Sequence, residues 1–570
     1  MDRRGTGNWG RVRARARAHG LAGRVLGVAV LLALMIVPGF VVPTGAGAAG
    51  WQSAGTLPAA YSAPLATLLP DGRVLAVYGK NSALRSREDD TWMALPSFDG
   101  KTRGGRLLVL VDGQVLLAGG APNLMANNPF SLTKQVLRFD PAKNLWTKEA
   151  DMPTGRAAHT LTALADGRVL VVGGAVAGLS PRQPVTTVGQ VELYDPATKS
   201  WAATMSLAQA RFGHTATLLP DGRVLVVGGS VSKTVNSENA GSETLVSAEI
   251  YSPATGRWEF ATPLSTPRGG HTATLLYDGT VLIIGGEDGG GVTTAVRYDP
   301  LTNSWIAAGS LGAKVSRFAA TLLLGGDVLV TGGVGSNNAP VATAMRYVRA
   351  DNNPWQSFDA LTTPCASHSA ILVKSEVLVI GGEGNAAPTS AERSTAAPSG
   401  TVCYVETGRC LYGTFLTYWQ GHGQLPINGY PLSNPFPEKL EDGRVYMVQY
   451  FERVRMEFHP EQPAPFDILL GQFGRRLHPA DARVSPQAGA RFFELTGHNV
   501  SGGFLAYWEA NGGLTQFGYP LTEVITETLE DGKQYRVQNF ERARFEYHPE
   551  NAAPCDVLLG QFGRQILAGR

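Results

Sequence analysis

A short aliphatic segment that ends in glycine recurs seven times between residues 73 and 382. The last six copies end in Gly-Gly, and the second glycines are Gly120, Gly174, Gly229, Gly286, Gly333 and Gly382. These glycines lie about 50 residues apart, the length of one blade of a β-propeller. A single blade cannot bury both of its faces, so several blades must stack around an axis. The period therefore predicts a mostly β chain built around a propeller.

The fourth unit illustrates the content of one repeat. His214 opens a first strand, and residues 220–223, Pro-Asp-Gly-Arg, form a turn in which Asp-Gly tolerates a positive φ. Residues 224–227 return antiparallel, residues 248–253 make a third strand that stops at a proline, and Trp258 marks a fourth. We therefore expect four antiparallel strands in each blade.

The tryptophans set the number of blades. Six of them follow a third strand, namely Trp92, Trp146, Trp201, Trp258, Trp305 and Trp355. The last unit has no tryptophan after residues 390–394, but Trp51 begins a segment with the composition of a fourth strand. We expect this segment to complete the last blade, so that seven blades over residues 49–394 leave no exposed sheet edge. The tryptophans and paired glycines are accordingly predicted to be structural.

The repeat resembles the kelch motif. Residues 156–160, Arg-Ala-Ala-His-Thr, are followed by the Gly-Gly pair, by Tyr194-Asp195-Pro196 and by Trp201 in kelch order, and the likeness covers residues 51–394. The resemblance implies a propeller that serves as a binding platform in many proteins. It also implies an alternative, because the galactose oxidase group uses this scaffold for an enzyme.

The copper site of galactose oxidase-like enzymes does not match this sequence. Such a site needs two histidines, two tyrosines and a cysteine that is crosslinked to one of the tyrosines. The histidines of the propeller are His159, His214, His271 and His368. They occupy equivalent or nearly equivalent repeat positions, which favours a repeated structural role, and Cys365 is the only cysteine between residues 49 and 394. We predict no metal and no cofactor.

Residues 1–48 have the pattern of a secretory signal peptide. Seven arginines precede or flank an apolar run over residues 25–42, and Ala46-Gly47-Ala48 offers a small-residue cleavage site. An uncleaved membrane anchor is the alternative, because the run approaches the roughly 20 residues of a spanning helix. Cleavage would change the formal charge from +2 to −4 and leave no membrane span. A secreted chain without basic excess is not expected to bind nucleic acid.

Four cysteines allow three complete pairings in a secreted chain. Cys403 and Cys410 are close enough in sequence to close a small loop, whereas Cys365 and Cys555 have no obvious partners. The pairing remains open at this level.

A different repeat follows the linker at residues 395–402. Residues 413–475 recur as residues 502–564, and the matched blocks are 89 positions apart. The matched blocks are Gly-x-Phe-Leu-x-Tyr-Trp, Gly-Tyr-Pro-Leu, Glu-Asp-Gly, Phe-Glu-Arg and Leu-Leu-Gly-Gln-Phe-Gly-Arg. We predict two small α+β modules over residues 403–478 and 490–570, joined by a linker at residues 479–489. In the second module, residues 504–508 are expected to be helical, and residues 533–537 and 543–547 to be strands.

The module is similar to the LGFP repeat of bacterial wall-associated proteins. Phe517-Gly518-Tyr519-Pro520 stands at the core of the second copy, followed by Asp-Gly and Val-Gln-x-Phe-Glu blocks. Those repeats usually carry glycine where this chain has Arg453 and Arg542. The resemblance implies attachment to cell-envelope glycan or lipid.

Three groups of side chains are candidate binding residues. Glu287, Asp288 and Glu383 follow Gly-Gly pairs, and Tyr418, Trp419, Tyr507 and Trp508 could form a sugar platform or belong to a core. Glu457, His459 and Glu461 alternate near a strand end, as do Glu546, His548 and Glu550. This pattern is compatible with ligand contact or catalysis, but its exact duplication favours a structural hydrogen-bonded role.

The favoured hypothesis is a secreted, non-enzymatic adaptor that can be retained on the cell wall, with cell-wall glycan or an extracellular protein as its partner. Long loops at residues 121–133, 175–189 and 230–245 follow second strands of consecutive blades and should crowd one face of the ring. The alternative is an oxidase or a carbohydrate-active enzyme that uses the acids at the mouth of the ring.

Overall fold

The computed structural model describes two parts of the chain, residues 1–48 and 49–570, as separate units. The described residues are 50–98, 100, 102–121, 132–176, 186–235, 239–288, 291–323, 326–348, 354–374, 376–384, 389–395, 402–404, 406–442, 445–459, 462, 466–552 and 555–568. The predicted signal peptide and most of the long loop at residues 121–133 lie outside them. Within the described residues, no helix has the length and apolar character needed to cross a membrane.

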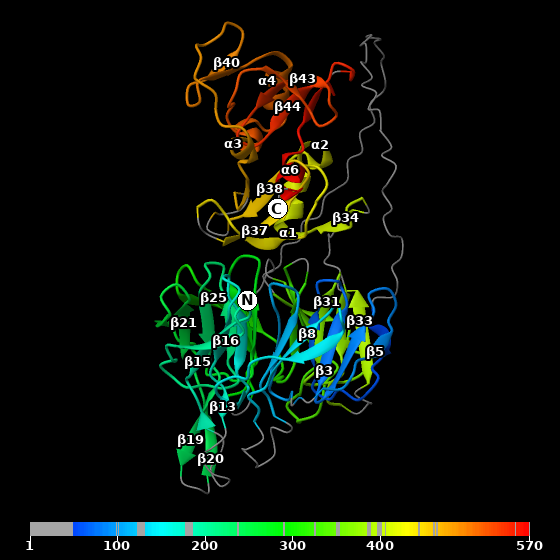
Figure 1. Ribbon diagram of the computed structural model, residues 1–570, viewed down its shortest axis with the longest axis vertical. Helices are drawn as coiled ribbons and strands as arrows, with labels where there is room; N and C mark the ends of the chain where they lie inside the picture. The colour runs from blue at the N-terminus through cyan, green and yellow to red at the C-terminus, as the bar shows by residue number, and fades with distance from the viewer. Residues whose placement is uncertain are drawn as a thin grey trace, which may run out of the picture. The chain divides into compact units, whose positions relative to one another are not determined.

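Among the described residues, seven four-stranded antiparallel sheets, numbered I to VII here, precede residue 396 (Figure 1). Sheet I comprises β2 (Leu65–Leu68), β3 (Val74–Tyr78), β4 (Asn81–Arg85) and β5 (Trp92–Ala94). Sheet II comprises β6 (Arg106–Val109), β7 (Val115–Ala118), β8 (Val136–Asp140) and β9 (Leu145–Lys148). Sheet III comprises β11 (Thr160–Ala163), β12 (Val169–Val172), β15 (Val191–Asp195) and β16 (Ser200–Thr204). Sheets IV and V comprise β17 (Thr215–Leu218), β18 (Val224–Val227), β21 (Ala248–Ser252) and β22 (Arg257–Ala261); and β23 (Thr272–Leu275), β24 (Val281–Ile284), β25 (Thr294–Asp299) and β26 (Ser304–Ser310). Sheets VI and VII comprise β27 (Ala319–Leu322), β28 (Val328–Thr331), β29 (Ala344–Tyr347) and β30 (Trp355–Phe358); and β31 (Ser369–Val373), β32 (Glu376–Ile380), β33 (Ser390–Thr395) and β1 (Gln52–Thr56).

The first strands of these sheets contact one another in a closed cycle that runs from sheet I to sheet VII and back to sheet I. Strand β1 from the beginning of the described chain pairs antiparallel with β33, with Gln52 opposite Arg393. The absence of a tryptophan after the last repeat predicts this pairing, which closes the ring of sheets. It leaves the last sheet with four strands that come from both ends of the domain.

The tryptophans join each sheet to the one before it. The indole N–H of Trp201 donates to the Ala150 carbonyl at 2.9 Å, and that of Trp258 donates to the Met205 carbonyl at 2.7 Å. Trp51 follows the same rule in sheet VII, because its indole N–H donates to the Asp359 carbonyl at 2.7 Å. An indole in this position combines apolar packing with a satisfied donor, which explains its recurrence.

The Gly-Gly pairs and histidines also interlock between sheets. A Cβ on Gly228 would lie 2.4 Å from the Arg268 carbonyl oxygen and 3.0 Å from Cε1 of His271, both from the next repeat. His271 in turn shares a 2.9 Å hydrogen bond with the hydroxyl of Thr215 in the preceding sheet. Neighbouring sheets therefore approach so closely that only glycine fits, and Phe318 fills the histidine position in sheet VI against Gly285.

Two short β segments extend from sheets III and IV. Strands β10 (Arg156–Ala157), β13 (Ala175–Val176) and β14 (Thr186–Thr187) form one sheet, and β19 (Ser230–Val235) and β20 (Asn239–Thr244) form a hairpin. Figure 1 shows this hairpin extending beyond the edge of the seven sheets. The loops after second strands are thus partly ordered into β structure.

The two C-terminal copies have the same order of elements. The first contains β34 (Val402–Tyr404), β35 (Arg409–Leu411), α1 (Gly413–Gly421), α2 (Gln424–Asn428), β36 (Phe436–Lys439), β37 (Val445–Tyr450), β38 (Arg455–Phe458), β39 (Ile468–Leu470) and α3 (Phe473–Leu477). The second contains β40 (Arg491–Phe493), β41 (His498–Val500), α4 (Gly502–Ala510), α5 (Gly513–Phe517), β42 (Ile525–Thr528), β43 (Gln534–Asn539), β44 (Arg544–Tyr547), β45 (Val557–Leu559) and α6 (Phe562–Ala568). In each copy a four-stranded sheet carries the helices α1 and α2 or α4 and α5.

The copies dock through their repeated motifs. A Cβ on Gly474 would lie 1.7 Å from the Phe540 carbonyl oxygen, and a Cβ on Gly563 would lie 1.8 Å from that of Phe451. Phe562 of the second copy joins an apolar cluster with Tyr450 of the first. The Gln-Phe-Gly-Arg block of each copy therefore packs against the Phe-Glu-Arg block of the other.

Candidate functional site

The predicted acids of the propeller lie at the ends of second strands. Glu287 and Asp288 are exposed, and the backbone of Glu287 bridges to Gly269. Burial lowers the pKa of Arg268 to about 10, an effect that the nearby charge of Asp288 partly offsets. Glu287 and Asp288 are thus solvated acids at the edge of sheet V.

Glu383 is held between two arginines from two other sheets. Its Oε1 accepts from Nη2 of Arg103 at 3.1 Å, and its Oε2 accepts from Nη1 of Arg317 at 3.0 Å. Arg317 precedes the neighbouring sheet VI, whereas Arg103 precedes sheet II, which is not a neighbour of sheet VII around the cycle. The repeat pattern carries no signal for either arginine, and sequence reasoning missed both.

The loops of sheets III and IV are joined on the same side of the sheets, since both follow second strands. The hydroxyl of Thr187 in β14 donates to that of Ser232 in β19 at 2.8 Å, and the Ser232 amide donates back to Thr187 at 2.8 Å. These loops therefore form one surface together with the Arg103–Glu383–Arg317 cluster, which we call the loop face.

The predicted sugar-platform aromatics are mostly core residues. Trp419 and Trp508 are 5% and 4% exposed, and each indole donates to a glycine carbonyl within its own copy at 3.2 Å. Tyr418 is also buried, and Tyr507 is half-buried against Phe517 and Phe545. An aromatic platform needs an open ring face. Tyr418, Trp419 and Trp508 do not present one, because they fill the space between helix and sheet.

A buried arginine organises the polar residues of the first copy. Arg455 in β38 is 2% exposed and contacts Glu457 Oε1 at 2.6 Å, Glu438 Oε1 at 3.1 Å and Glu441 Oε2 at 3.2 Å. Burial opposes the charge of Arg455, but the carboxylate of Glu457 and the hydroxyl of Tyr450 outweigh it and raise the pKa of this guanidinium above its ordinary value. An arginine surrounded by several carboxylates is a costly way to stabilise a fold.

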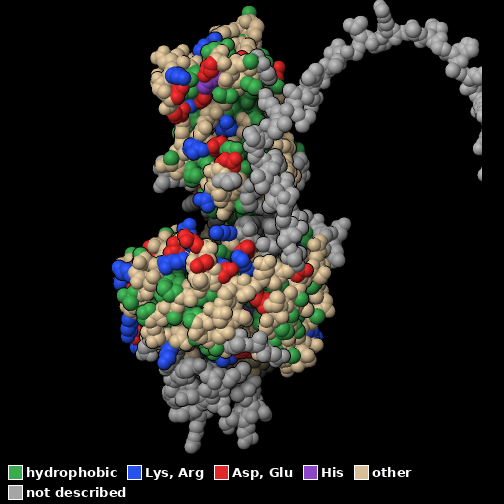
Figure 2. Space-filling model, turned by 90° about the vertical axis from the view of Figure 1, so that its right-hand side faces the viewer, with side chains coloured by type: hydrophobic (Ala, Val, Ile, Leu, Met, Phe, Trp, Pro, Cys, Tyr) green, Lys and Arg blue, Asp and Glu red, His purple; other side chains and the backbone are tan. Residues whose placement is uncertain are grey.

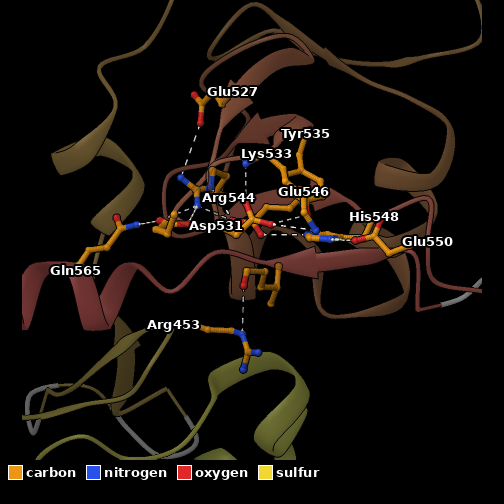
Figure 3. A network of polar contacts seen from close by, with 12 residues as sticks. Arg453, Glu527, Asp531, Lys533, Tyr535, Arg544, Glu546, His548, Glu550 and Gln565 are labelled. Atoms are coloured by element: carbon orange, nitrogen blue, oxygen red, sulfur yellow. Dashed lines mark hydrogen bonds and ion pairs between the residues drawn. The ribbon is translucent and has the colours of Figure 1, made fainter.

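The same network recurs in the second copy (Figure 3). Arg544 contacts Glu546 Oε1 at 2.7 Å and Glu530 Oε1 at 3.2 Å, while its Nη1 lies 3.8 Å from Glu527 Oε2. His548 lies between Glu546 and Glu550, at 3.4 and 2.9 Å. The duplicated Glu-x-His pattern is thus part of an ion-pair network, in line with the structural role that its duplication favours. Glu461 lies outside the described residues.

A tyrosine and an aspartate flank each network. The hydroxyl of Tyr446 donates to Asp442 Oδ2 at 2.8 Å, and that of Tyr535 donates to Asp531 Oδ2 at 2.8 Å. The second hydrogen bond raises the pKa of Tyr535 to about 12. The ring of each tyrosine also packs on a histidine, His459 or His548, with centroids 4.1 and 4.2 Å apart. The sequence analysis included Asp442 and Asp531 only within the repeated Glu-Asp-Gly block and singled out neither tyrosine.

The network of the first copy opens into a cavity of about 900 Å³. Its wall contains Glu441, Asp442, Tyr446, His459 and Arg476, and it is completed by Arg542 from the second copy. This volume falls within the ~300–1,000 Å³ typical of small-molecule sites. No cluster of three or more His, Cys, Asp or Glu side chains in the described ranges is placed to hold a metal ion.

Among the described residues, one cysteine is disulfide-bonded and two are free thiols. Cys410 is disulfide-bonded and lies opposite Cys403 in the pairing of β34 with β35. Cys365 is buried and Cys555 is exposed, and both are free.

Comparisons with known proteins point to the propeller. A family model for the kelch motif matches residues 268–312, which contain sheet V. The matches support a kelch-repeat β-propeller. Kelch-like protein 34 of Homo sapiens is 29% identical over 184 residues, which are 32% of this chain and 27% of that protein. Kelch-like protein terF of Aspergillus terreus is 25% identical over 279 residues, or 48% of this chain and 59% of that protein.

The chain therefore spans 27% and 59% of the length of these two relatives. A solved structure of YjhT aligns with a TM-score of 0.40 and 18% identity, covering 55% of this chain and 98% of the other.

Proposed function

We propose that this protein is a secreted adaptor whose seven-bladed kelch propeller binds a protein partner and whose C-terminal pair holds it on envelope glycan. The joining of the β14 and β19 loops through Thr187 and Ser232 is the observation that carries the first half. It concentrates ordered, variable backbone on one face of a ring that otherwise repeats, and binding residues are typically placed on such loops. The kelch-like relatives support a propeller that mediates protein interactions.

The charge pattern agrees with a protein-binding surface. Away from the loop face, Figure 2 shows acidic and basic side chains that are interspersed instead of gathered into a patch of one sign. The Arg103–Glu383–Arg317 cluster lies on the loop face and offers both signs within one contact area. Such mixed charge favours specific partners over polyanions.

Capture of partners by residues 49–570 tests the platform. The double variant Arg103→Ala/Arg317→Ala should lose a partner that binds at the loop face. Asp221→Ala is the matched control, because Asp221 lies in the turn at the opposite ends of the strands, where it pairs with Arg223 at 2.6 Å. Equal capture by all three proteins would place the partner elsewhere and reject the loop face.

Co-sedimentation with purified bacterial cell walls tests the attachment. Residues 49–570 should sediment with the walls, and residues 49–400 should remain in solution. If both proteins sediment equally, attachment does not depend on the C-terminal pair. If neither does, the proposed attachment is wrong.

A further inference from the structure

The side chains of Arg453 and Arg542 each extend from their own C-terminal copy to a backbone carbonyl of the other copy. Nε of Arg542 donates to the Leu470 carbonyl of the first copy at 3.3 Å, and Nε of Arg453 donates to the Leu559 carbonyl of the second at 3.4 Å. Each arginine also donates to a carbonyl of its own copy at 2.8 Å, Arg542 to Leu514 and Arg453 to Leu425. Each side chain therefore crosses from its own copy to the strand beside the other copy's network. Figure 3 shows Arg453 donating to a backbone carbonyl of the strand that lies between it and the network of Arg544.

Arg542 consequently lines the cavity of the first copy, although it belongs to the second. Arg453 makes the equivalent contact with β45 of the second copy, in which Glu530, Asp531 and Tyr535 repeat Glu441, Asp442 and Tyr446. We call the cavity of the first copy the first cleft and expect its counterpart in the second copy to form a second cleft, each named by the copy that supplies the aspartate. Each cleft is complete only when the two copies are docked.

The charges of the first cleft balance. Four acidic side chains and three arginines line it, and Arg455 behind the wall supplies a fourth positive charge. Several of these groups are already paired, while the side chains of Glu441 and its counterpart Glu530 remain 69% and 60% exposed. A balanced surface of planar donors and acceptors has no excess charge to attract a polyanion or a polycation.

The apolar part of the wall consists of Leu440, Leu469 and Leu470, beside the ring of Tyr446. Carboxylates and guanidinium groups form paired hydrogen bonds with vicinal hydroxyls, and the leucines can cover C–H faces. A neutral, hydroxyl-rich ring matches this combination better than an apolar or a charged ligand.

We infer that the docked copies form two composite clefts, each of which binds a neutral oligosaccharide and each of which is completed by the arginine of the other copy. The inference rests on the proposed glycan attachment and deepens it. It makes the C-terminal pair bivalent, so a glycan polymer with repeated units would be held more tightly than a single oligosaccharide.

Calorimetric titration of residues 49–570 tests this with three neutral hexasaccharides, cellohexaose, chitohexaose and maltohexaose, and with a heparin hexasaccharide as the anionic probe. At least one neutral probe should bind with two sites per chain, and the heparin probe should not bind. Asp442→Asn or Asp531→Asn should each leave one site. Asp140→Asn in a propeller turn is the matched control and should leave two, because Asp140 only accepts local bonds from Ala142 and Lys143.

Double variants test whether the clefts are composite. Arg542→Gly/Asp442→Asn affects one cleft and should leave one site, whereas Arg542→Gly/Asp531→Asn affects both and should leave none. If each cleft belonged to a single copy, these two results would be exchanged. Arg542→Gln repeats the test with the side-chain stem retained, and thermal unfolding of each variant verifies that the copies remain folded.

The outcomes separate this inference from the proposed function. The exchanged pattern, or the absence of binding to all three neutral probes, overturns the inference even if the protein sediments with walls. Two sites in solution without wall sedimentation would support the clefts and reject the envelope attachment.

Discussion

Nε of Arg475 in the first C-terminal copy donates to Glu541 Oε1 in the second at 3.0 Å. The relationship is reciprocal, because Arg564 of the second copy donates to Glu452 of the first at 2.5 Å. The two copies thus face each other through equivalent surfaces. Their interface behaves like that of a symmetric dimer whose halves are linked in one chain.

Substitution at the centre of this interface should uncouple the copies. In Gly474→Ala the new methyl group would lie 1.7 Å from the Phe540 carbonyl oxygen, so the backbone must separate. We expect a loss of about 1–3 kcal/mol in unfolding free energy, as for other overpacked sites. Gly421→Ala is the control, since nothing lies within 4 Å of its Cβ position at the end of α1. Denaturant unfolding of both variants compares the costs, and equal costs would contradict the docking.

A glycine of the propeller allows the same kind of test. Gly228 has φ +55°, and its Cβ would lie 2.4 Å from the Arg268 carbonyl oxygen, whereas Gly222 has φ +83° and open space around it. Both alanine variants force a left-handed residue, at about 1–2 kcal/mol. Only Gly228→Ala adds a clash, so its Tm should fall further. Equal shifts in Tm would mean that the sheets do not approach as closely as described.

The propeller should lose stability as the pH falls below about 6.5. Burial lowers the pKa of His271 to about 3 and that of His368 to about 4. The unfolded chain, with an ordinary imidazole pKa near 6.5, then binds protons that the folded state excludes. Each histidine therefore adds stability that is complete above about pH 6.5 and declines by about 1.4 kcal/mol per pH unit toward the folded pKa.

Unfolding free energies measured between about pH 5 and 7 verify this slope. In His271→Gln one titrating group is removed, so the decline should be shallower than in the unsubstituted protein. An unchanged slope in this variant would show that His271 is not buried in its neutral form.

The two free thiols should differ sharply in reactivity. Burial and the nearby charge of Glu392 raise the pKa of Cys365 to about 12, and only 8% of this residue is exposed. The thiolate is the reactive form, so Cys365 should resist alkylation in the folded protein. Mass spectrometry after labelling near pH 8 should find Cys555 modified, and Cys365 only after unfolding without reductant. Rapid native labelling of Cys365 would contradict the packing of sheet VII.

Much of the fold could be predicted from short-range sequence patterns. The period of the glycine pairs and the Asp-Gly turns predict the seven sheets, and the position of Trp51 predicts the pairing of β1 with β33. The helix expected at residues 504–508 lies within α4, and the expected strands at residues 533–537 and 543–547 correspond to β43 and β44. These features depend on residues that are close together or periodic, so a single sequence displays them.

The candidate sites were harder to predict from the sequence than the fold. The acids were found, but the arginines that hold Glu383 were not, because Arg103 is 280 residues away from it in the sequence. The buried positions of Trp419 and Trp508 likewise follow from helix–sheet packing, which the Tyr-Trp pattern alone leaves open.

The repeats, the strand pattern of the propeller and the two related C-terminal copies can thus be predicted from the residues alone. The crossing of Arg453 and Arg542 between those copies cannot, although both residues are visible in the sequence as departures from a glycine position. This is because local patterns record backbone conformation and burial. Which long side chain meets which distant carbonyl or carboxylate is decided by how the finished elements dock.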